Sequence, residues 1–342
     1  MRIELPISKS IANRLLILQA IQGDGLVTVS CDMPDDVRIM SEAIRRLGER
    51  REARIDLGNC GTAMRFLTAY CAQLDGKTVI LEGVERMHHR PIGQLVDALR
   101  EIGADIEYLG EEGFPPLRIK GCILDKHRIV TINNPLSTQF VSALLLIGAN
   151  VQTDSTSPYI TLTRELIQHY TTLHNSIQRY TIEKDWSSAA FWYEYVALHG
   201  GEITLPGLSR DSLQGDKVVA DIFAQLGVTT QYMEEGIVIY PSPLQSTTYT
   251  LHQDFSACPD LYPAVALTCE RLGVELHATG VESLLLKESD RLRAVREHRT
   301  DADHRMAMAL LIAGYEVDDT ACISKSYPQF IEQWKSVNTS NE

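Results

Sequence analysis

The chain has 342 residues, of which 44% are hydrophobic, and this length predicts two domains with a sizeable core. Its formal net charge of −13 argues against nucleic acid or an anionic membrane as a partner. There is no apolar run that would span a bilayer and no signal-peptide pattern, and the seven cysteines lack metal-ligand spacing, so we expect a cytoplasmic protein without structural zinc.

The first expected helix, "SKSIANRLLIL" at 8–18, begins with an unusual arrangement of charges. Lys9 lies in its first turn and Arg14 one turn later, although the helix dipole disfavours cations at an N-terminus. Free backbone N–H groups together with Lys and Arg suit a bound phosphate or carboxylate. The alternative is a capped surface helix with solvated basic side chains, and this stretch alone leaves both interpretations open.

The same kind of helix start recurs along the chain, as a small polar or acidic residue followed by small apolar residues. Such helices are expected at 60–70, 136–146, 185–198, 258–269 and 302–314. If the two domains aim these N-termini at one cleft, six positive dipole ends and several cations meet there. The pattern therefore predicts an anion site within an acidic protein.

A second kind of helix is amphipathic, with apolar residues at i, i+3, i+4 and i+7. It is expected at 35–48, 90–106 and 215–230, where Gly48, Gly103 and Gly227 are interpreted as C-caps. Short strands are predicted at 77–84, 116–121, 128–133, 201–207, 236–241 and 274–280. The resulting strand–helix order repeats about six times, which predicts two pseudo-symmetric halves. The alternative is a generic α/β protein whose helix caps are alike by chance.

Eight motifs occur in a recognisable order. They are "LPISKSIANR", "LGNCGTAMR", "ERMHHRPIGQLVDALR", "STQFVSALLL", "SRDSLQGD", "KESDRL", "DHRMAMAL" and "SKSYPQF". Over nearly its whole length the chain resembles the 5-enolpyruvylshikimate-3-phosphate synthase family. The ordered set is far more specific than any single motif.

The resemblance implies an α/β fold of two pseudo-symmetric domains, each made of three βαβαββ units in an inside-out α/β barrel, with the active site in the interdomain cleft. One domain is expected to comprise 1–7 plus 185–342, and the other 8–184. The chain then crosses between the domains near 7–8 and near 183–185. One such chain supplies a complete cleft, so a monomer is expected.

The implied reaction transfers the carboxyvinyl group of phosphoenolpyruvate to the 5-hydroxyl of shikimate 3-phosphate and releases phosphate. No metal or redox cofactor is implied. Both substrates carry a phosphate and a carboxylate, which explains a need for several Arg and Lys residues. Addition and removal of a proton at one carbon need an acid and a base.

Site residues are implied by motif matches alone. For shikimate 3-phosphate they are Lys9, Ser10, Arg14, Ser137, Thr138, Gln139, Thr156, Tyr159, Asp260 and Lys287, with Ser157 as an alternative to Thr156. For phosphoenolpyruvate they are Lys9, Asn59, Gly61, Thr62, Arg90, Gln139, Arg291, Arg305 and Lys325. The catalytic group comprises Asp260 for the hydroxyl proton and Glu288 for the methylene carbon, with Lys9 as a rival for either step.

The chain also departs from the family pattern. Compared with the family pattern it is short near 150, near 172 and at 296–302. We expect that the protein has loops at these places that the given sequence omits, rather than true deletions. Two other functions stay open. The chain resembles less closely the enolpyruvyl transferases that act on UDP-N-acetylglucosamine, and a non-catalytic protein that binds shikimate 3-phosphate would share most of the motifs.

Overall fold

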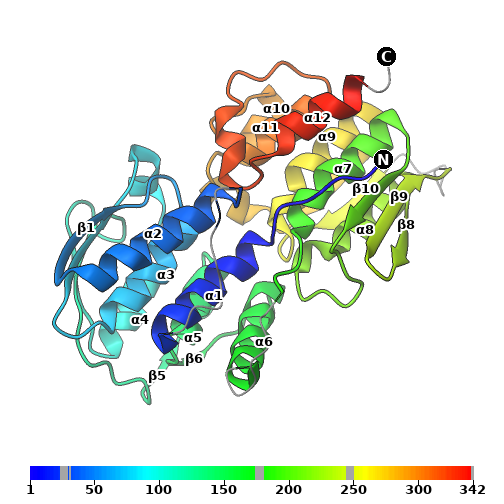
Figure 1. Ribbon diagram of the computed structural model, residues 1–342. Coiled ribbons are helices and arrows are strands. Elements are labelled where there is room, and N and C mark those ends of the chain that lie inside the picture. Colours follow the sequence, from blue (N-terminus) through cyan, green and yellow to red (C-terminus); the bar gives the residue numbers. More distant parts are fainter. Residues whose placement is uncertain (24–29, 31, 174–180, 244–249, 340–342) are drawn as a thin grey trace. The chain divides into compact units, whose positions relative to one another are not determined.

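A computed structural model describes residues 1–23, 30, 32–173, 181–243 and 250–339 (Figure 1). The chain separates into two compact units. Unit 1 comprises Met1–Lys9, Asp32–Asp35 and Ile182–Glu342, and unit 2 comprises Ser10–Cys31 and Asp36–Thr181. The domain bounds expected from the sequence, 1–7 plus 185–342 and 8–184, stay a prediction.

In its described part, unit 2 consists of helices packed on a four-stranded sheet and a two-stranded sheet. Its helices are α1 (Lys9–Gln22), α2 (Asp35–Glu49), α3 (Gly61–Ala72), the 3₁₀ helix η1 (Glu85–His89), α4 (Gly93–Glu101), α5 (Thr138–Leu146) and α6 (Pro158–Leu173). Its strands are β1 (Glu52–Asp56), β2 (Thr78–Glu82), β3 (Asp105–Tyr108), β4 (Leu117–Lys120), β5 (Ile129–Thr131) and β6 (Asn150–Gln152). The larger sheet has the order β1-β2-β4-β3, and β5 pairs with β6 in parallel.

Unit 1 has a three-stranded and a two-stranded sheet among its described residues. The helices are α7 (Trp186–His199), η2 (Gly215–Val218), α8 (Val219–Gln225), η3 (Pro259–Leu261), α9 (Tyr262–Leu272), η4 (Glu282–Leu286), α10 (Arg291–Glu297), α11 (His304–Ile312), η5 (Ala321–Lys325) and α12 (Phe330–Thr339). The strands are β7 (Ile203–Pro206), β8 (Val228–Met233), β9 (Gly236–Pro241), β10 (Thr250–Asp254) and β11 (Glu275–Thr279). The sheet orders are β7-β9-β8 and β10-β11.

The two expected kinds of helix are both present. Helices α3 and α7 are apolar on all sides and buried along nearly their whole length, as expected for helices inside a unit. Within unit 1, α7 packs against α8, α9 and α11 and against all three strands of the larger sheet. By contrast, α2 buries one face only and exposes its charged residues. Each unit therefore contains a buried helix, α3 in unit 2 and α7 in unit 1. The packing of each helix fixes the position of its N-terminal cap, Cys60 or Asp185.

The six strands expected from the sequence are confirmed as β2, β4, β5, β7, β9 and β11. Gly103 and Gly227 follow α4 and α8 with φ of 100° and 84°, which confirms them as residues that end a helix. The expectation for Gly48 is wrong, because α2 continues through it to Glu49. Gly48 is not among the glycines with positive φ, so it does not make the left-handed turn that stops a helix.

The expectation of a loop left out at 296–302 is also wrong. The full sequence runs directly from α10 to α11, and the structure describes every residue of that connection. The turn is made by residues with positive φ, namely His298, Asp301 and Ala302. The connection between α10 and α11 is therefore short in the protein itself, and only a short stretch of sequence separates Arg291 from Arg305.

Two passages of the chain lie side by side in unit 1. The amide of Ser8 donates to the carbonyl of Glu183 at 2.8 Å, and the amide of Asp185 donates to the carbonyl of Pro6 at 3.0 Å. An antiparallel bridge joins Ile7 to Lys184. These bonds place the start of α1, with Lys9, beside the start of α7.

Candidate active site

In unit 2, Arg14 is a buried cation held by neutral groups. Its guanidinium donates to the Thr163 hydroxyl at 2.7 Å, the Ser10 carbonyl at 2.8 Å, the Ser142 hydroxyl at 3.2 Å and the Tyr159 carbonyl at 3.3 Å. Only 2% of the residue is exposed, and burial lowers its pKa to about 10. No carboxylate pairs with Arg14 among the residues that the structure describes, so its charge is available to a bound anion.

A second group of unit 2 side chains joins the starts of α3 and α5. Arg65 donates from Nη1 to Oε1 of Gln139 at 3.0 Å, and Nε2 of Gln139 donates to the Thr62 hydroxyl at 3.0 Å. The Arg65 guanidinium also lies over the Phe140 ring, 5.6 Å from its centroid. Thr62 and Gln139, predicted for different loops of the site, are therefore in direct contact.

Gly61 is the first residue of α3, and the Cys60 sulfur caps that helix by accepting from the Ala63 amide at 3.4 Å. A Cβ added at Gly61 would lie 2.6 Å from Nη1 of Arg65 and 2.6 Å from both terminal nitrogens of Arg90. The absence of a side chain thus lets two guanidinium groups approach the helix N-terminus. This is a geometry suited to an anion.

The other predicted residues of unit 2 lie at helix starts. The Ser137 hydroxyl caps α5 by accepting from the Gln139 amide at 3.4 Å, and Thr138 is the first residue of that helix. Tyr159 is in the first turn of α6 and points its carbonyl at Arg14. Ser157 accepts from the Tyr159 amide at 3.3 Å, whereas Thr156 is exposed in the preceding turn, and the choice between these two stays open.

Two further predicted residues of unit 2 are half-buried. Asn59 lies in the turn before α3, and Ser10 is the second residue of α1, where its carbonyl accepts from Arg14.

In unit 1, Arg291 is the centre of a network of ion pairs. Its Nε donates to Oδ2 of Asp303 at 2.8 Å, its Nη1 to Oδ1 of Asp260 at 2.8 Å, and its Nη2 to Oε2 of Glu288 at 3.3 Å. The Arg291 side chain is 1% exposed. Burial alone would lower its pKa, but Asp303, Asp260 and Glu288 outweigh burial and raise it.

Asp260 contacts three cations in this network. Besides Arg291, it forms an ion pair with Arg305, whose Nη2 lies 3.0 Å from Oδ2, and it accepts a hydrogen bond from Lys287 at 3.2 Å. Burial raises the pKa of this carboxyl, but Arg305, Lys287 and Arg291 outweigh burial and hold the pKa well below its usual range. With its cations in place, Asp260 is therefore a weak base.

Glu288 and Lys325 form the second part of the network. Nζ of Lys325 lies 2.7 Å from Oε1 of Glu288, and their side chains are 12% and 10% exposed. The other oxygen of Glu288 accepts from Arg291, so both predicted carboxylates share that arginine. Six predicted residues thus meet in unit 1, namely Asp260, Lys287, Glu288, Arg291, Arg305 and Lys325.

Lys9 acts on the same network through space. It lowers the pKa of Asp260 and opposes the rise in the pKa of Asp185, which caps α7. We use the name charged cluster of unit 1 for five cations and five carboxylates. They are Lys9, Lys287, Arg291, Arg305, Lys325, Asp185, Asp216, Asp260, Glu288 and Asp303.

Four members of this region were not among the predicted site residues, and one of them is Asp185, the cap of α7. Asp303 binds Arg291, accepts from the Arg305 amide at 2.9 Å and caps α11, so it positions both arginines. Asp216 lies in η2 and accepts from the Ser187 hydroxyl. His304 is 1% exposed, and neither of its ring nitrogens has a hydrogen-bond partner. The sequence signal for Asp303 and His304 was the motif "DHR", and for Asp216 the motif "QGD".

The His304 imidazole is neutral. Burial lowers its pKa, and the neighbouring Lys9, Arg305 and Lys325 lower the pKa further, to well below the usual value. A neutral imidazole beside three cations offers a ligand one donor and one acceptor.

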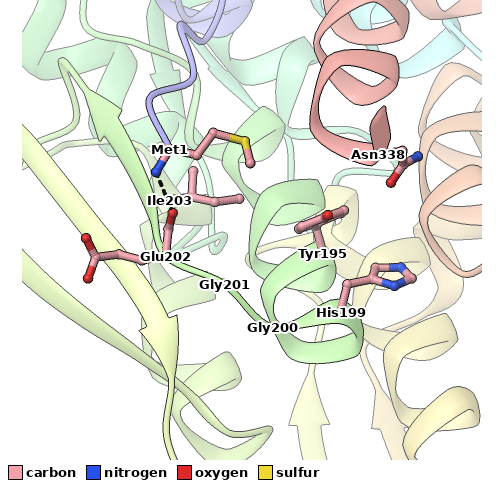
Figure 2. A pocket seen from close by; sticks show the side chains of 8 residues that line it. All are labelled: Met1, Tyr195, His199, Gly200, Gly201, Glu202, Ile203 and Asn338. Carbon is pink, nitrogen blue, oxygen red and sulfur yellow. Dashed lines mark hydrogen bonds between the residues drawn. The ribbon is translucent and has the colours of Figure 1, made fainter. Parts of the chain in front are cut away.

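A cavity of about 490 Å³ lies at the other end of α7 (Figure 2). It is lined by Met1, Tyr195, His199, Gly200, Gly201, Glu202, Ile203 and Asn338. Figure 2 shows the Met1 amino group bonded to the Glu202 carbonyl at 2.8 Å. The lining holds no Lys or Arg and none of the predicted site residues, so this cavity does not suit substrates with several negative charges.

No group of three or more His, Cys, Asp or Glu residues in the described part of the chain is arranged to hold a metal ion. None of the helices described is long and apolar enough to cross a membrane.

Comparison with known proteins assigns this arrangement to a family. The family described as EPSP synthase (3-phosphoshikimate 1-carboxyvinyltransferase) matches residues 49–298 and 296–334. The 3-phosphoshikimate 1-carboxyvinyltransferase of Bacteroides fragilis is 38% identical over 389 residues, covering 96% of this chain and 93% of that protein. That of Cellvibrio japonicus is 31% identical, covering 98% of this chain and 96% of that protein.

The fold is shared with a solved structure. The EPSP synthase of Acinetobacter baumannii superposes with a TM-score of 0.66 at 18% identity, covering 98% of this chain and 95% of that chain. The predicted fold class is thereby confirmed. The alignment with the Bacteroides fragilis protein extends over 389 residues, more than the 342 of this chain, so that relative has internal segments that this chain lacks.

Proposed function

The chain belongs to the EPSP synthase family, and from that membership we infer that it is a 3-phosphoshikimate 1-carboxyvinyltransferase. It transfers the carboxyvinyl group of phosphoenolpyruvate to the 5-hydroxyl of shikimate 3-phosphate and releases phosphate. A proton adds to the methylene carbon of phosphoenolpyruvate while the hydroxyl oxygen bonds to C2 and loses its own proton. The C–O bond to phosphate then breaks, and the carbon that gained a proton loses one. The shikimate pathway uses this product to make aromatic amino acids.

We assign shikimate 3-phosphate to the unit 2 residues around Arg14. The assignment is supported by a buried guanidinium whose partners are all hydroxyls or carbonyls, so that an incoming carboxylate or phosphate meets an uncompensated charge. Ser137, Thr138 and Gln139 add hydroxyl and amide groups at the start of α5. Ser10, Tyr159, and Thr156 or Ser157 complete this set from unit 2, and Lys9, Asp260 and Lys287 extend it from unit 1.

We assign phosphoenolpyruvate to the arginines and lysine of the charged cluster of unit 1, namely Arg291, Arg305 and Lys325, together with Lys9. From unit 2 we assign Arg90, Gln139, Asn59, Gly61 and Thr62 to the same substrate. The approach of two guanidinium groups to Gly61 supports this assignment. A phosphate and a carboxylate each take several charge-assisted hydrogen bonds, which this many cations supply.

The proposed mechanism depends on the ion pairs of Asp260, which control its pKa. In the free protein its three cations hold its pKa well below the usual range, so it does not take a hydroxyl proton. When the substrate anions bind, Arg291, Arg305 and Lys287 contact substrate oxygens instead of Asp260. The Asp260 pKa then rises because burial, which raises it, is no longer outweighed. Substrate binding thus turns Asp260 into a base.

Glu288 and Lys9 are the remaining groups for proton transfer. Glu288 is ion-paired with both Arg291 and Lys325. When either cation binds a substrate anion instead, one Glu288 oxygen becomes available for proton transfer at the methylene carbon. Lys9 is close enough to Asp260 to shift its pKa and carries its own proton. The choice between these two groups at each step stays open.

The test is phosphate release by purified protein given both substrates, beside Asp260→Ala and Asp211→Asn variants. Asp211 is an exposed carboxylate in unit 1, which makes it the matched control. The proposal predicts release that requires both substrates, falls sharply in Asp260→Ala and persists in Asp211→Asn. Binding of both substrates without any release would instead identify a non-catalytic relative.

We further propose that the enzyme acts as a monomer in the cytoplasm. One chain supplies every residue assigned to the two substrates, which supports a monomer. The free cysteines among the described residues are typical of a reducing compartment. Light scattering of the purified protein tests the first statement, since a mass of twice 38.2 kDa would contradict it.

A further inference from the structure

Two hydroxyls that are distant in the sequence hold one edge of the Arg14 guanidinium. Its Nε donates to the Thr163 hydroxyl at 2.7 Å, and its Nη2 donates to the Ser142 hydroxyl at 3.2 Å. The two hydroxyls also bond to each other, since Oγ1 of Thr163 lies 2.9 Å from Oγ of Ser142. Both residues are 0% exposed. Neither was among the predicted site residues, and together they join α1, α5 and α6 at one point.

The Thr163 hydroxyl is fixed to the backbone of its own helix. A guanidinium can only donate, so the Thr163 oxygen must accept from Nε and has its own proton left to donate. The Tyr159 carbonyl lies 2.7 Å from Oγ1 of Thr163, and it also accepts from Nη2 of Arg14 at 3.3 Å. Arg14 therefore cannot turn away from α6 without breaking its bonds to both Thr163 and Tyr159.

These bonds determine which atom of Arg14 is left for a ligand. A guanidinium has about five N–H groups to donate. Those of Nε and Nη2 bond to Thr163, Ser142 and Tyr159, and one of Nη1 bonds to the Ser10 carbonyl at 2.8 Å. The second N–H of Nη1 has no partner within the described ranges. It is therefore the donor that remains for a substrate anion.

Hydroxyls suit this task because they orient a guanidinium without neutralising it. A carboxylate at position 142 or 163 would pair with Arg14 and compete with the substrate, as Asp260 does at Arg291 in unit 1. An arginine side chain that nothing holds has many rotamers, and ordering it on binding costs affinity. The Phe66 ring, with its centroid 5.3 Å from Cζ of Arg14, adds an apolar contact from α3.

We propose that Ser142 and Thr163 are positioning residues for shikimate 3-phosphate, which hold the Arg14 guanidinium so that Nη1 is presented to the substrate. Neither hydroxyl touches the substrate in this scheme. Removal of either one leaves an N–H of Arg14 buried without a partner, so the guanidinium turns toward other acceptors. The inference rests on the proposed assignment of this substrate to Arg14.

Thr163→Val tests the hydroxyl, because valine keeps nearly the same volume. The Kd for shikimate 3-phosphate is expected to rise by about tenfold, as for one hydrogen bond to a charged group. Thr163→Ser keeps the hydroxyl and is expected to retain most of the affinity. Thr268→Val is the matched control. Thr268 is also 0% exposed and donates to the carbonyl four residues earlier, that of Ala264, at 2.7 Å, but in the described structure it bonds to no arginine.

A double-mutant cycle with Arg14→Met separates positioning from a general loss of stability. In the Arg14→Met background, Thr163→Val should cause no further loss of affinity, because no guanidinium is left to position. Steady-state kinetics gives a second readout. In Thr163→Val alone, the KM for shikimate 3-phosphate should rise, while kcat and the KM for phosphoenolpyruvate stay within about twofold of wild type.

Ser142→Ala serves if Thr163→Val does not fold, and it is expected to raise the same Kd by about three- to tenfold. Unchanged affinity in both variants, or losses that multiply with that of Arg14→Met, would overturn the inference and leave the proposed function intact. An Arg14→Met variant that binds shikimate 3-phosphate as wild type does would instead overturn the assignment of that substrate to Arg14, and the inference with it.

Discussion

The two units present their cations in opposite ways. In unit 2, Arg14 is surrounded by hydroxyls and carbonyls, and burial lowers its pKa to about 10. In unit 1, Arg291 and Arg305 are surrounded by carboxylates, which raise the pKa values of both despite burial. Under the proposed function, Arg14 is thus a cation already free of carboxylate partners, within the described residues, for an anion to bind, whereas an anion that binds unit 1 must first displace Asp260, Glu288 or both.

This difference has a chemical logic. A receptor of fixed charge suits a group that is held unchanged during the reaction, such as the phosphate and carboxylate of shikimate 3-phosphate. A site whose carboxylates become free on binding suits a step that needs a base. In the proposed mechanism, unit 1 thus keeps Asp260 inactive as a base until a substrate anion binds, while unit 2 needs no such change.

The largest effect is expected from Asp260→Asn, which makes unit 1 resemble unit 2 by removing a carboxylate from three cations. The turnover number kcat is expected to fall by about 10²- to 10⁴-fold because the base is lost. The KM for phosphoenolpyruvate should fall or stay unchanged, since its cations no longer need to be displaced. Steady-state kinetics separates the two constants, and an unchanged kcat would remove Asp260 from the mechanism.

Arg14→Met is expected to have the next largest effect, because it removes the preformed charge of unit 2. Affinity for shikimate 3-phosphate should drop by about ten- to a hundredfold, the usual strength of charge-assisted bonds. Equilibrium titration with that substrate measures the change. Arg45→Met is the control, since Arg45 is exposed and bonded to Glu42. Loss of affinity by both variants alike would show that Arg14 has no specific role.

Gly61→Ala is expected to perturb the phosphoenolpyruvate site of unit 2 while leaving unit 1 untouched. The new Cβ would displace the guanidinium groups of Arg65 and Arg90, so KM for phosphoenolpyruvate should rise by about tenfold. Gly110→Ala is a matched control, because its Cβ would make an ordinary contact, 3.6 Å from Cδ of Pro116. Equal KM values for the two variants in steady-state assays would contradict the expected role of Gly61.

The smallest effect is expected from Glu194→Gln, which tests the core of unit 1 rather than its site. Glu194 is fully buried on α7, neither carboxylate oxygen has a partner, and burial raises its pKa well above the usual value. Because the folded pKa exceeds the unfolded value of about 4.3, wild-type stability should fall as the pH rises above that value. The variant lacks this loss and should be more stable by about 1–3 kcal/mol at about pH 8.

Urea unfolding at about pH 5 and pH 8 measures this stability difference. Glu234→Gln, at an exposed position of the same unit, is the control. A free energy of unfolding that depends on pH equally in wild type and Glu194→Gln would contradict an ionisable Glu194 in the core.

Local patterns allowed much of the fold to be predicted. The small residues before α3, α5 and α7 act as caps through Cys60, Ser137 and Asp185, and such caps depend on neighbours within three residues. Gly48 shows the limit of this method. The same residue type that stops α4 and α8 lies inside α2, because backbone conformation and not residue type alone decides where a helix stops.

The charged groups of the site were found through a resemblance of motifs, but their partners were not. Asp216 meets Ser187 across 29 positions, and Asp260 meets Arg291 across 31. Such pairings depend on how helices pack, which no local pattern shows. Asp303 was not predicted for a related reason. An Asp before a helix is typical of a helix cap, and nothing in the sequence shows that the same side chain also pairs with Arg291.

The short turn between α10 and α11 has a practical consequence for protein engineering. Asp303 ties Arg291 and Arg305 together from inside the turn, so their geometry does not depend on the length of the chain at 298–302. Arg299 is an exposed residue of this segment, although Thr300 after it is buried. Exposed turns accept foreign inserts best. A small reporter or sensor domain spliced in after Arg299 would sit beside both arginines and report on the site without replacing any residue assigned to it.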